Sequence, residues 1–368
     1  RLLLGEVKKN GTVSLTETLD TPDLCWIESS EGKHAGEFIV AFSRKKDEVS
    51  RPAFVPAFES GKKEVKRICP VGSDWLYAKI YCGVRTGEKL LADVLRPFVE
   101  QLTADKTIDK FFFIRFQDPD HHIRIRFHNA TQEDFWKEVI VRLNRIMQPY
   151  LENRLVHKIQ FGTYRREVER YGYDTMSLSE DIFWHQSQSV LKFISMLEGD
   201  EGEQYRWQVG LKAIDLFLDS FSYSLERKSN LVTVLDKNFC AEFKIGSEQR
   251  KKIYERFANH KSIIDVLMSD RWEDDENLSK AINIFKVDNT DYLSTIDQIL
   301  KAQSVKGNAK QLEQLLTSYL HMFVNRLFMG NQRKVELVLY EYLWKIYESK
   351  LAREKRERKI LGPKIVSS

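Results

Sequence analysis

The spacing of apolar residues between Trp75 and Phe161 changes several times between two periods, and this succession limits the folds open to the chain. Apolar residues at every second position are typical of strands, whereas spacings of three and four are typical of amphipathic helices. The turn sequence Asp118-Pro119-Asp120 separates two predicted strands and indicates a hairpin. The predicted elements are, in order, a strand at Trp75–Val84, a helix at Glu88–Leu102, strands at Lys110–Phe116 and His121–Phe127, a helix at Glu133–Leu151 and a strand at Leu155–Phe161.

This strand–helix–strand–strand–helix–strand order is that of the split βαβ or ferredoxin-like arrangement. After Tyr171 the spacing becomes helical. We therefore predict an α+β fold, in which a small ferredoxin-like sheet over residues 72–165 precedes a mainly helical C-terminal half over residues 166–352. Helices are expected near Leu178–Leu197, Tyr205–Leu225, Gln249–Leu267, Gln311–Leu327 and Val335–Leu351.

The two ends of the chain differ from the part between them. Residues 1–71 contain short apolar runs such as Glu37–Phe42, broken by Gly and charged residues, which favours strands and loops. The first segment, starting at Arg1, reads like the middle of a longer polypeptide, so residues 1–71 are expected to be a linker or the tail of a preceding domain. Residues 353–368 are strongly charged, and a frayed tail is expected there.

Composition narrows the class of function. The 58 Lys and Arg residues nearly balance the 54 Asp and Glu residues, and a net charge of +4 is too even for a nucleic-acid binder, whereas a peptide or small anionic ligand fits. The four cysteines lie far apart and form neither a CxxC pair nor a dense disulfide scaffold, so a reducing cytoplasm is expected. No apolar run approaches about eighteen residues, and no membrane span is expected.

The predicted strand from His121 to His128 carries the most unusual pattern. Alternation places His122, Arg124, Arg126 and His128 on one face and apolar residues on the other. Two arginines two positions apart repel one another unless solvent screens them or an anion lies between them. The strand therefore indicates either a carboxylate or phosphate site, or a solvated sheet face.

Two further places carry polar residues at helical spacing. Glu167 and Arg170 stand three apart and would share a helix face, where an ordinary surface ion pair is the simplest interpretation. His321 and Asn325 stand four apart, and Asn325 or Arg326 could orient the imidazole or help to bind an anion. A histidine among apolar helix residues is more often a core residue than a catalyst. No His pair or Cys cluster has metal-ligand spacing, so no metal site is expected.

Four motifs together resemble those of a known family. They are Gly72-Ser-Asp-Trp-Leu-Tyr-Ala-Lys-Ile-Tyr81; Phe113-Ile-Arg-Phe-Gln-Asp-Pro-Asp120 followed by His122-Ile-Arg-Ile-Arg126; Glu167-Val-Glu-Arg-Tyr-Gly172; and His321 with Asn325-Arg-Leu327. In the order and spacing of these motifs, residues 72 to about 350 are similar to the C-terminal, SpaB-type domain of class I lanthipeptide dehydratases, which also occurs in the split dehydratases of thiopeptide pathways.

In that family one domain uses glutamyl-tRNA to esterify Ser and Thr hydroxyls of a precursor peptide, and a second domain eliminates glutamate to leave dehydroalanine or dehydrobutyrine. The resemblance implies that residues 72–368 are the second domain, a lyase with no cofactor of its own, and that residues 1–71 end or follow the glutamylation domain. It also implies a bacterial cytoplasmic enzyme of lantibiotic or related antibiotic biosynthesis, with no direct nucleic-acid site in this chain. The implied partners are a glutamylated precursor peptide, a glutamylation domain in the same chain or in a separate protein, and a second copy in a homodimer.

The matching positions imply an elimination site containing Arg124, Arg126, Glu167, Arg170 and His321. Elimination removes the Cα proton, builds negative charge on the neighbouring carbonyl oxygen and releases a carboxylate from the β carbon. An arginine with a pKa above about 12 is a poor base, so arginines would clamp the anions while the imidazole carries the proton. The expected catalytic residues are His321, Arg126 and Arg170, and the expected substrate-binding residues are Arg124, Glu167, Asn325 and Arg326.

The chain departs from the family pattern at Gln186, where many relatives have an acid, and at Tyr173, which replaces a second glycine. These changes concern substrate handling more than the type of reaction. Two alternatives stay open. One is a relative that forms the pyridine ring of thiopeptides, although the Arg and His set favours elimination. The other is a non-catalytic peptide-binding subunit that presents substrate to a partner.

Overall fold

A computed structural model describes residues 27–30, 32–34, 65–197, 199–305 and 309–361. The chain divides into two compact units, residues 1–62 and residues 63–368. In the first unit, strands β1 (Ile27–Ser29) and β2 (Gly32–His34) pair as a short antiparallel hairpin. The strand expected in the run Glu37–Phe42 lies outside the described residues.

The second unit contains a four-stranded sheet with strand order β5-β6-β4-β7, in which every pair of neighbours is antiparallel. The element order is the expected one, and the assignment to the ferredoxin-like class stays a prediction. A helical segment joins β4 to β5, a short turn joins β5 to β6, and a second helix joins β6 to β7. The elements are β4 (Trp75–Cys82), α2 (Val84–Lys89), the π-helical η2 (Leu90–Leu95), α3 (Arg96–Ala104), β5 (Lys110–Gln117), β6 (His121–His128), α4 (Phe135–Glu152) and β7 (Val156–Gly162).

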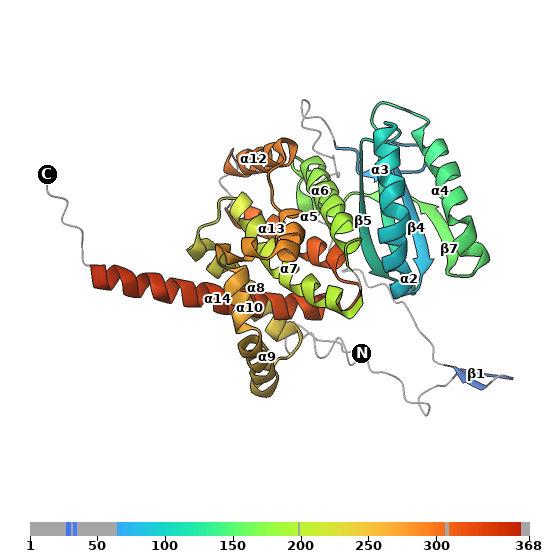
Figure 1. Cartoon of the computed structure of the whole chain (residues 1–368). Helices are drawn as coiled ribbons and strands as arrows, with labels where there is room; N and C mark the ends of the chain where they lie inside the picture. The colour runs from blue at the N-terminus through green and yellow to red at the C-terminus, as the bar shows by residue number, and fades with distance from the viewer. Residues whose placement is uncertain (1–26, 31, 35–64, 198, 306–308, 362–368) are drawn as a thin grey trace, which may run out of the picture. The chain divides into compact units, whose positions relative to one another are not determined.

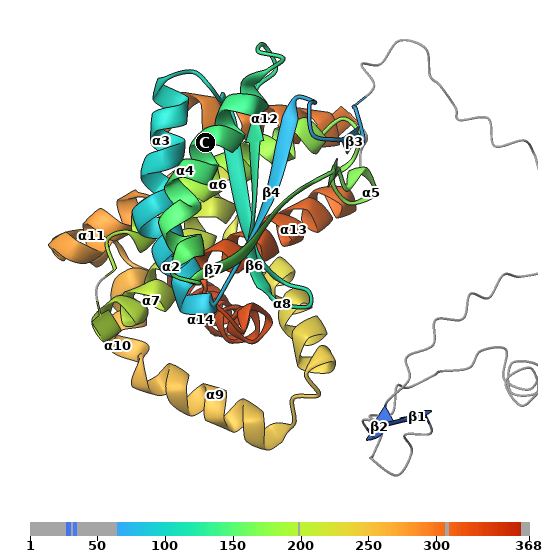
Figure 2. The ribbon, with the colours of Figure 1, turned by 90° about the vertical axis from the view of Figure 1, so that its right-hand side faces the viewer.

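The two faces of this sheet have different neighbours. Ile123, Ile125 and Phe127 are buried on the face where α3 and α4 lie (Figure 1, Figure 2), and the ring of Phe98 in α3 meets Phe127 edge-on at 6.0 Å. This apolar side of β6 is the one that its alternation predicted. The opposite face carries Arg126 and, on β5, packs against the helical half of the unit.

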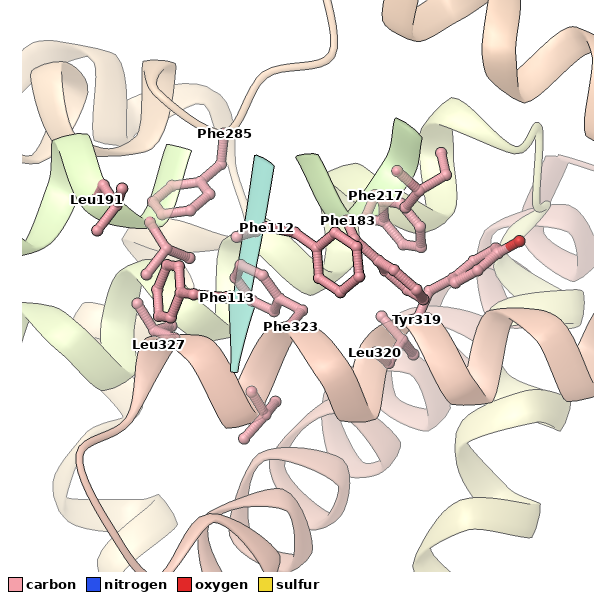
Figure 3. Packing of buried hydrophobic residues seen from close by; sticks show 14 of the residues in the cluster. Phe112, Phe113, Phe183, Leu191, Phe217, Phe285, Tyr319, Leu320, Phe323 and Leu327 are labelled. Carbon is pink, nitrogen blue, oxygen red and sulfur yellow. The ribbon is translucent and has the colours of Figure 1, made fainter. Parts of the chain in front are cut away.

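The helical half is built around α6 and α13, which both pack on β5. Figure 3 shows the aromatic rings that fill this contact, among them Phe112, Phe183, Tyr319 and Phe323. The elements are α5 (Val168–Tyr171), α6 (Met176–Ile194), α7 (Gly199–Ser220), α8 (Leu225–Glu242), α9 (Ser247–Asn259), α10 (Lys261–Leu267), the 3-10 helix η3 (Asp270–Asp274), α11 (Glu276–Asn283), α12 (Thr290–Val305), α13 (Ala309–Leu327) and α14 (Gln332–Leu361).

Apolar spacing located α6, α7, α13 and α14, and the single helix expected at Gln249–Leu267 is divided into α9 and α10, whereas α8, α11 and α12 were missed. In α8, Lys228 and Asp236 are buried, so polar side chains occupy inner positions and weaken the apolar period. The frayed tail expected from Arg353 is wrong as far as Leu361, because α14 continues to that residue. Lys, Arg and Glu are good helix formers, and Glu354 pairs with Arg358 one turn later at 3.8 Å.

A small second sheet fixes the segment that follows β7. Strand β3 (Ile68–Cys69) pairs antiparallel with β8 (Tyr164–Arg165), so residues just before Gly72 belong to this unit. Next to β8, the buried Arg166 donates from Nε to Glu180 Oε1 at 2.7 Å, and Tyr164 donates to the same oxygen at 2.9 Å. These bonds hold α5, which carries Glu167 and Arg170, against α6. Within the described part of the chain, no helix has the length and apolar character that crossing a membrane requires.

Candidate active site

A cavity of about 280 Å³ brings together two residues that the sequence placed in the site, His321 and Arg170. They come from α13 and α5, which are far apart in the chain. The remaining lining residues come from α8, α13 and α14: Phe239, Thr317, Ser318, Arg333, Glu336 and Tyr340. A cavity of this size, lined by an imidazole, two guanidinium groups and a carboxylate, can receive one small anionic group with part of its carrier.

The imidazole of His321 is held by a carboxylate. Its Nδ1 atom lies 3.0 Å from Oε2 and 3.1 Å from Oε1 of Glu336, whose side chain is 1% exposed, while His321 is 29% exposed. No described residue hydrogen-bonds to Nε2, so a proton on Nδ1 leaves Nε2 free to accept one from a ligand. The amide of Asn325, which could have oriented the imidazole, hydrogen-bonds to the backbone of Arg115. The structure replaces that expectation with Glu336.

The carboxylate of Glu336 has three hydrogen-bond partners: His321, Arg333 and Tyr340. Arg333 donates to its Oε2 at 3.2 Å and Tyr340 donates to its Oε1 at 3.2 Å. Burial and the charge of Glu336 raise the pKa of Tyr340 well above its usual range, so this phenol stays a donor. Burial opposes the charge of Arg333, but its bonds to Glu242 and Glu336 outweigh burial and raise its pKa. The carboxylate is therefore fixed in position, and through it the imidazole ring.

Sequence reasoning missed Glu336 and Arg333, although a signal was present. Glu336 and Tyr340 stand four apart at the start of the helix predicted over residues 335–351, and Arg333, two residues before that start, joins the same face if the helix begins one turn earlier. An acid within an otherwise apolar helix face indicates a buried partner, and Tyr340 is itself 1% exposed.

The ion pair expected between Glu167 and Arg170 is present. The segment turns as the short helix α5, and Arg170 Nη1 lies 3.3 Å from Glu167 Oε2. Both side chains are exposed, at 46% and 64%, so the pair is weak in itself and leaves Arg170 able to bind an anion. Of the two, only Arg170 lines the cavity.

Arg126 is buried without an acidic partner among the described residues. Its guanidinium carbon lies 4.6 Å from the ring centre of Tyr77, 4.9 Å from that of Phe112 and 4.7 Å from that of Tyr164. The side chain is 8% exposed, and its Nε and Nη1 atoms have no hydrogen-bond partner in the described structure. Burial lowers its pKa, partly offset by Tyr164 and Tyr77. Three rings stabilise the cation through their faces and leave two donors free.

The other residues of β6 predicted on this face, His122, Arg124 and His128, already have partners. Arg124 donates from Nε to His122 Nε2 at 3.0 Å, and its guanidinium carbon lies 3.3 Å above the ring of Phe116. His128 Nδ1 lies 2.5 Å from Asp109 Oδ1. The predicted shared face is confirmed by the cross-strand register, which sets Arg126 opposite Tyr77.

Asn325 and Arg326 hold α13 to the edge of the sheet and are not among the residues that line the cavity. The Asn325 amide exchanges two hydrogen bonds with the backbone of Arg115, at 3.0 and 2.9 Å. The fully buried Arg326 donates to the carbonyl of Phe113 at 2.8 Å and to Gln186 at 3.1 Å. Burial lowers the pKa of Arg326 to about 9. Gln186 accepts one of its hydrogen bonds without neutralising the cation, and Nη2 of Arg326 has no hydrogen-bond partner in the described structure.

The phenol of Tyr171 feels the charges of three arginines, namely Arg170 of the cavity and the buried Arg126 and Arg326. Burial raises its pKa to about 12, and the charges of Arg170, Arg326 and Arg126 oppose this rise. Its ring stacks on that of Tyr319 with centres 6.2 Å apart. The cavity arginine and the two buried arginines therefore act on the same phenol.

One group of side chains in the described structure has the spacing of metal ligands, and the guanidinium group of an arginine binds its carboxylates. Ligand atoms of Asp236, Cys240 and Glu341 lie within 4.8 Å of one another. Arg250 donates to Asp236 at 2.7 Å and to Glu341 at 3.2 Å. The acidic charge there is thus met by a guanidinium group.

Residues 75–347 match the family described as the lantibiotic biosynthesis dehydratase C-terminal domain, and the chain belongs to that family. The family inferred from the four sequence motifs is thereby confirmed.

The chain is 25% identical over 317 residues to the subtilin biosynthesis protein SpaB of Bacillus subtilis, which covers 84% of this chain and 29% of SpaB. It is 24% identical over 279 residues to the nisin biosynthesis protein NisB of Lactococcus lactis subsp. lactis, covering 75% of this chain and 26% of NisB. The chain therefore spans less than a third of the length of these relatives.

A solved structure shares the fold. The tRNA-dependent lantibiotic dehydratase MibB from Microbispora sp. 107891 superposes with a TM-score of 0.57 at 17% identity, covering 77% of this chain and 29% of MibB. At this identity the likeness concerns the fold alone.

Proposed function

We propose that this chain eliminates glutamate from glutamylated Ser or Thr side chains of a ribosomal precursor peptide, which gives dehydroalanine or dehydrobutyrine. Membership of the dehydratase family supports dehydration as the overall reaction. The observation that carries the elimination step is the His321–Glu336 pair, which faces one cavity together with Arg170 and Arg333.

In the proposed reaction His321 Nε2 takes the Cα proton. The electrons of the Cα–H bond form the Cα=Cβ bond, the Cβ–O bond breaks, and its electron pair leaves with the glutamate carboxylate. Glu336 holds the proton on Nδ1 and stabilises the imidazolium that forms, since a buried carboxylate beside the ring favours its charged state. The same imidazolium can then protonate the leaving group.

The arginines meet the negative charges of this step. Arg170 lines the cavity and is half exposed, so it can clamp the departing carboxylate by two parallel hydrogen bonds. Arg126 has two unpaired donors held by aromatic rings, which suits the oxygen on which enolate-like charge develops. Glu167 positions Arg170, and Arg124, which lies two residues from Arg126 on the same face of β6, binds the substrate.

The proposal includes the setting of the reaction. This domain needs no cofactor, and the glutamyl group comes from glutamyl-tRNA through a glutamylation domain in the same chain or in a separate protein. The bacterial cytoplasm supplies the charged tRNA and the precursor peptide. A homodimer is the assembly that we propose, and the identity of the precursor peptide is left to experiment.

The test supplies the full chain with a glutamylated Ser-containing peptide and measures loss of glutamate by mass spectrometry. We expect dehydrated peptide from the native chain and unchanged glutamylated peptide from His321→Ala. The control His260→Ala alters a histidine that lines a different cavity and should retain activity. Folded native chain that leaves the glutamate in place contradicts elimination, and so does a His321→Ala variant of native activity, as a non-catalytic peptide carrier would give.

A further inference from the structure

The part of the sheet beyond Arg126 carries cations on three neighbouring strands. The register sets Lys79 of β4 directly opposite Arg124 of β6, and sets Tyr81 of β4 opposite Lys158 of β7. Like charges that face one another across two strands destabilise a sheet. We call the surface formed by Lys79, Arg124 and Lys158, with the rings of Tyr81, His122 and His157 between them, the basic sheet face.

None of the three cations of the basic sheet face forms a salt bridge with an acid in the described part of the chain. Elsewhere in this unit paired cations are common, as in Arg142 with Asp105 at 2.9 Å. Burial lowers the pKa of His122, and the charges of Arg124 and Lys79 act in the same direction, against the hydrogen bond to Asp120 and the charge of Asp118. The repulsion between Lys79 and Arg124 is not offset by a salt bridge in the described structure, which is the pattern of a surface that an external anion completes.

A bulge in β7 places Lys158 on the basic sheet face. The register between β4 and β7 shifts after Tyr81, which is paired with Lys158, while Cys82 is paired with Val156. The bulged residue is His157, and a bulge re-aims a side chain that regular alternation would point to the other face. As a result, the Lys158 ammonium lies 4.0 Å from the centre of the Tyr81 ring and the His157 ring lies 5.7 Å from the same ring.

We propose that the basic sheet face binds an acidic segment of peptide through its carboxylates. The three strands lie side by side, so their cations form a row that an extended chain with acids at intervals can follow. Lys158 is exposed, and Lys79 and Arg124 are half-buried, so their charged groups are accessible. Binding itself does not depend on the elimination reaction; the identification of this peptide with the substrate of the elimination site rests on the proposed function.

The aromatic rings favour a peptide over a nucleic acid. Single-stranded nucleic acids bind open sheets by stacking bases on free aromatic faces. Here Tyr81 is 4% exposed, is stacked on His122 at 4.5 Å and is covered by Lys158. Phe116 lies beneath the guanidinium group of Arg124. Tyr81 and Phe116 thus each hold a cation over one ring face, so those faces are not free to stack on a base, although Phe116 is 38% exposed.

The test measures binding of fluorescein-labelled hexaglutamate to the full chain by fluorescence anisotropy, beside labelled hexaglutamine and labelled hexauridine. The double variant Lys79→Gln with Lys158→Gln removes two cations of the basic sheet face. Its matched control, Lys137→Gln with Lys252→Gln, removes the same charge from exposed lysines on α4 and α9. Thermal unfolding of each variant checks that the fold is retained.

We expect hexaglutamate to bind, hexaglutamine not to bind, and the dissociation constant for hexaglutamate to rise about tenfold in the test variant and less than about twofold in the control. The inference is overturned if hexaglutamate does not bind, if both variants weaken binding equally, or if hexauridine binds more tightly than hexaglutamate. Loss of glutamate from a glutamylated peptide is scored separately. Failure of that reaction with intact hexaglutamate binding removes the proposed function and leaves this inference standing.

Discussion

The Nδ1 atom of His321 lies 3.0 Å from the Oε2 atom of Glu336, a carboxylate buried between α13 and α14. This contact gives the imidazole of His321, which lines the cavity, one orientation and one proton position. The rest of the lining consists of two arginines, three hydroxyl-bearing side chains and Phe239, so the pair is suited to moving a proton next to a developing anion.

Replacing Glu336 with Gln should reduce elimination while leaving peptide binding nearly intact. The amide keeps the shape but no longer stabilises a charged imidazole, so we expect kcat to fall at least about tenfold with little change in KM. The measurement is the rate of glutamate loss as a function of pH. Glu242→Gln, which removes the other carboxylate partner of Arg333, is the control and should stay near native activity. An equal loss in both variants would show that Arg333, and not the imidazole, mediates the effect.

Replacing two buried arginines with Met should change the free energy of unfolding in opposite directions. Arg126 has unpaired donors and no acid beside it, so Arg126→Met should leave the free energy of unfolding unchanged or raise it by about 1 kcal/mol, while elimination is lost. Arg166 pairs with the fully buried Glu180, so Arg166→Met strands a carboxylate and should cost about 3 kcal/mol or more. Denaturant unfolding of both variants is the measurement. A strongly destabilised Arg126→Met would mean that the cation is needed for folding.

Asn325→Ala should weaken the attachment of α13 to the sheet. It leaves the N–H and C=O of Arg115 unpaired, and we expect a loss of about 1–3 kcal/mol in the free energy of unfolding. Asn283→Ala, at an exposed position on α11, serves as the control and should change stability by less than about 0.5 kcal/mol. If Asn325→Ala leaves the free energy of unfolding unchanged, Asn325 does not anchor α13 and stays a candidate for the substrate contact expected from sequence.

The free energy of unfolding should fall in alkaline solution, because buried thiols ionise at lower pH in the unfolded chain than in the folded protein. Burial raises the pKa of Cys82 to about 11 from a usual value of 9.0, so between these values the folded state binds more protons than the unfolded state. The free energy of unfolding contributed by this thiol is therefore complete below about pH 9 and is lost as pH rises toward about 11. Cys82→Ala should flatten the decline when unfolding is measured at pH values across this window. An identical slope in both proteins would contradict the assignment.

Local sequence patterns determined the parts of this protein in which interacting residues are close in the chain. The alternation of β6 set Arg124 and Arg126 on one face, and the spacing of Glu167 and Arg170 set an ion pair, because the geometry of a strand or a helical turn fixes these positions without help from the remaining fold. The same kind of pattern located the long helices and, through motifs in family order, the family itself.

Tertiary structure alone decided which side chains share a cavity. Sequence spacing assigned Asn325 to His321, but helix packing turns Asn325 to the edge of β5 and brings Glu336 of the next helix to the imidazole. Likewise, the absence of a salt-bridge partner for Arg126 in the described structure depends on what β5, β8 and α6 place beside it. Residues on separate elements meet according to how those elements pack, and a period along one element carries no information about its partner.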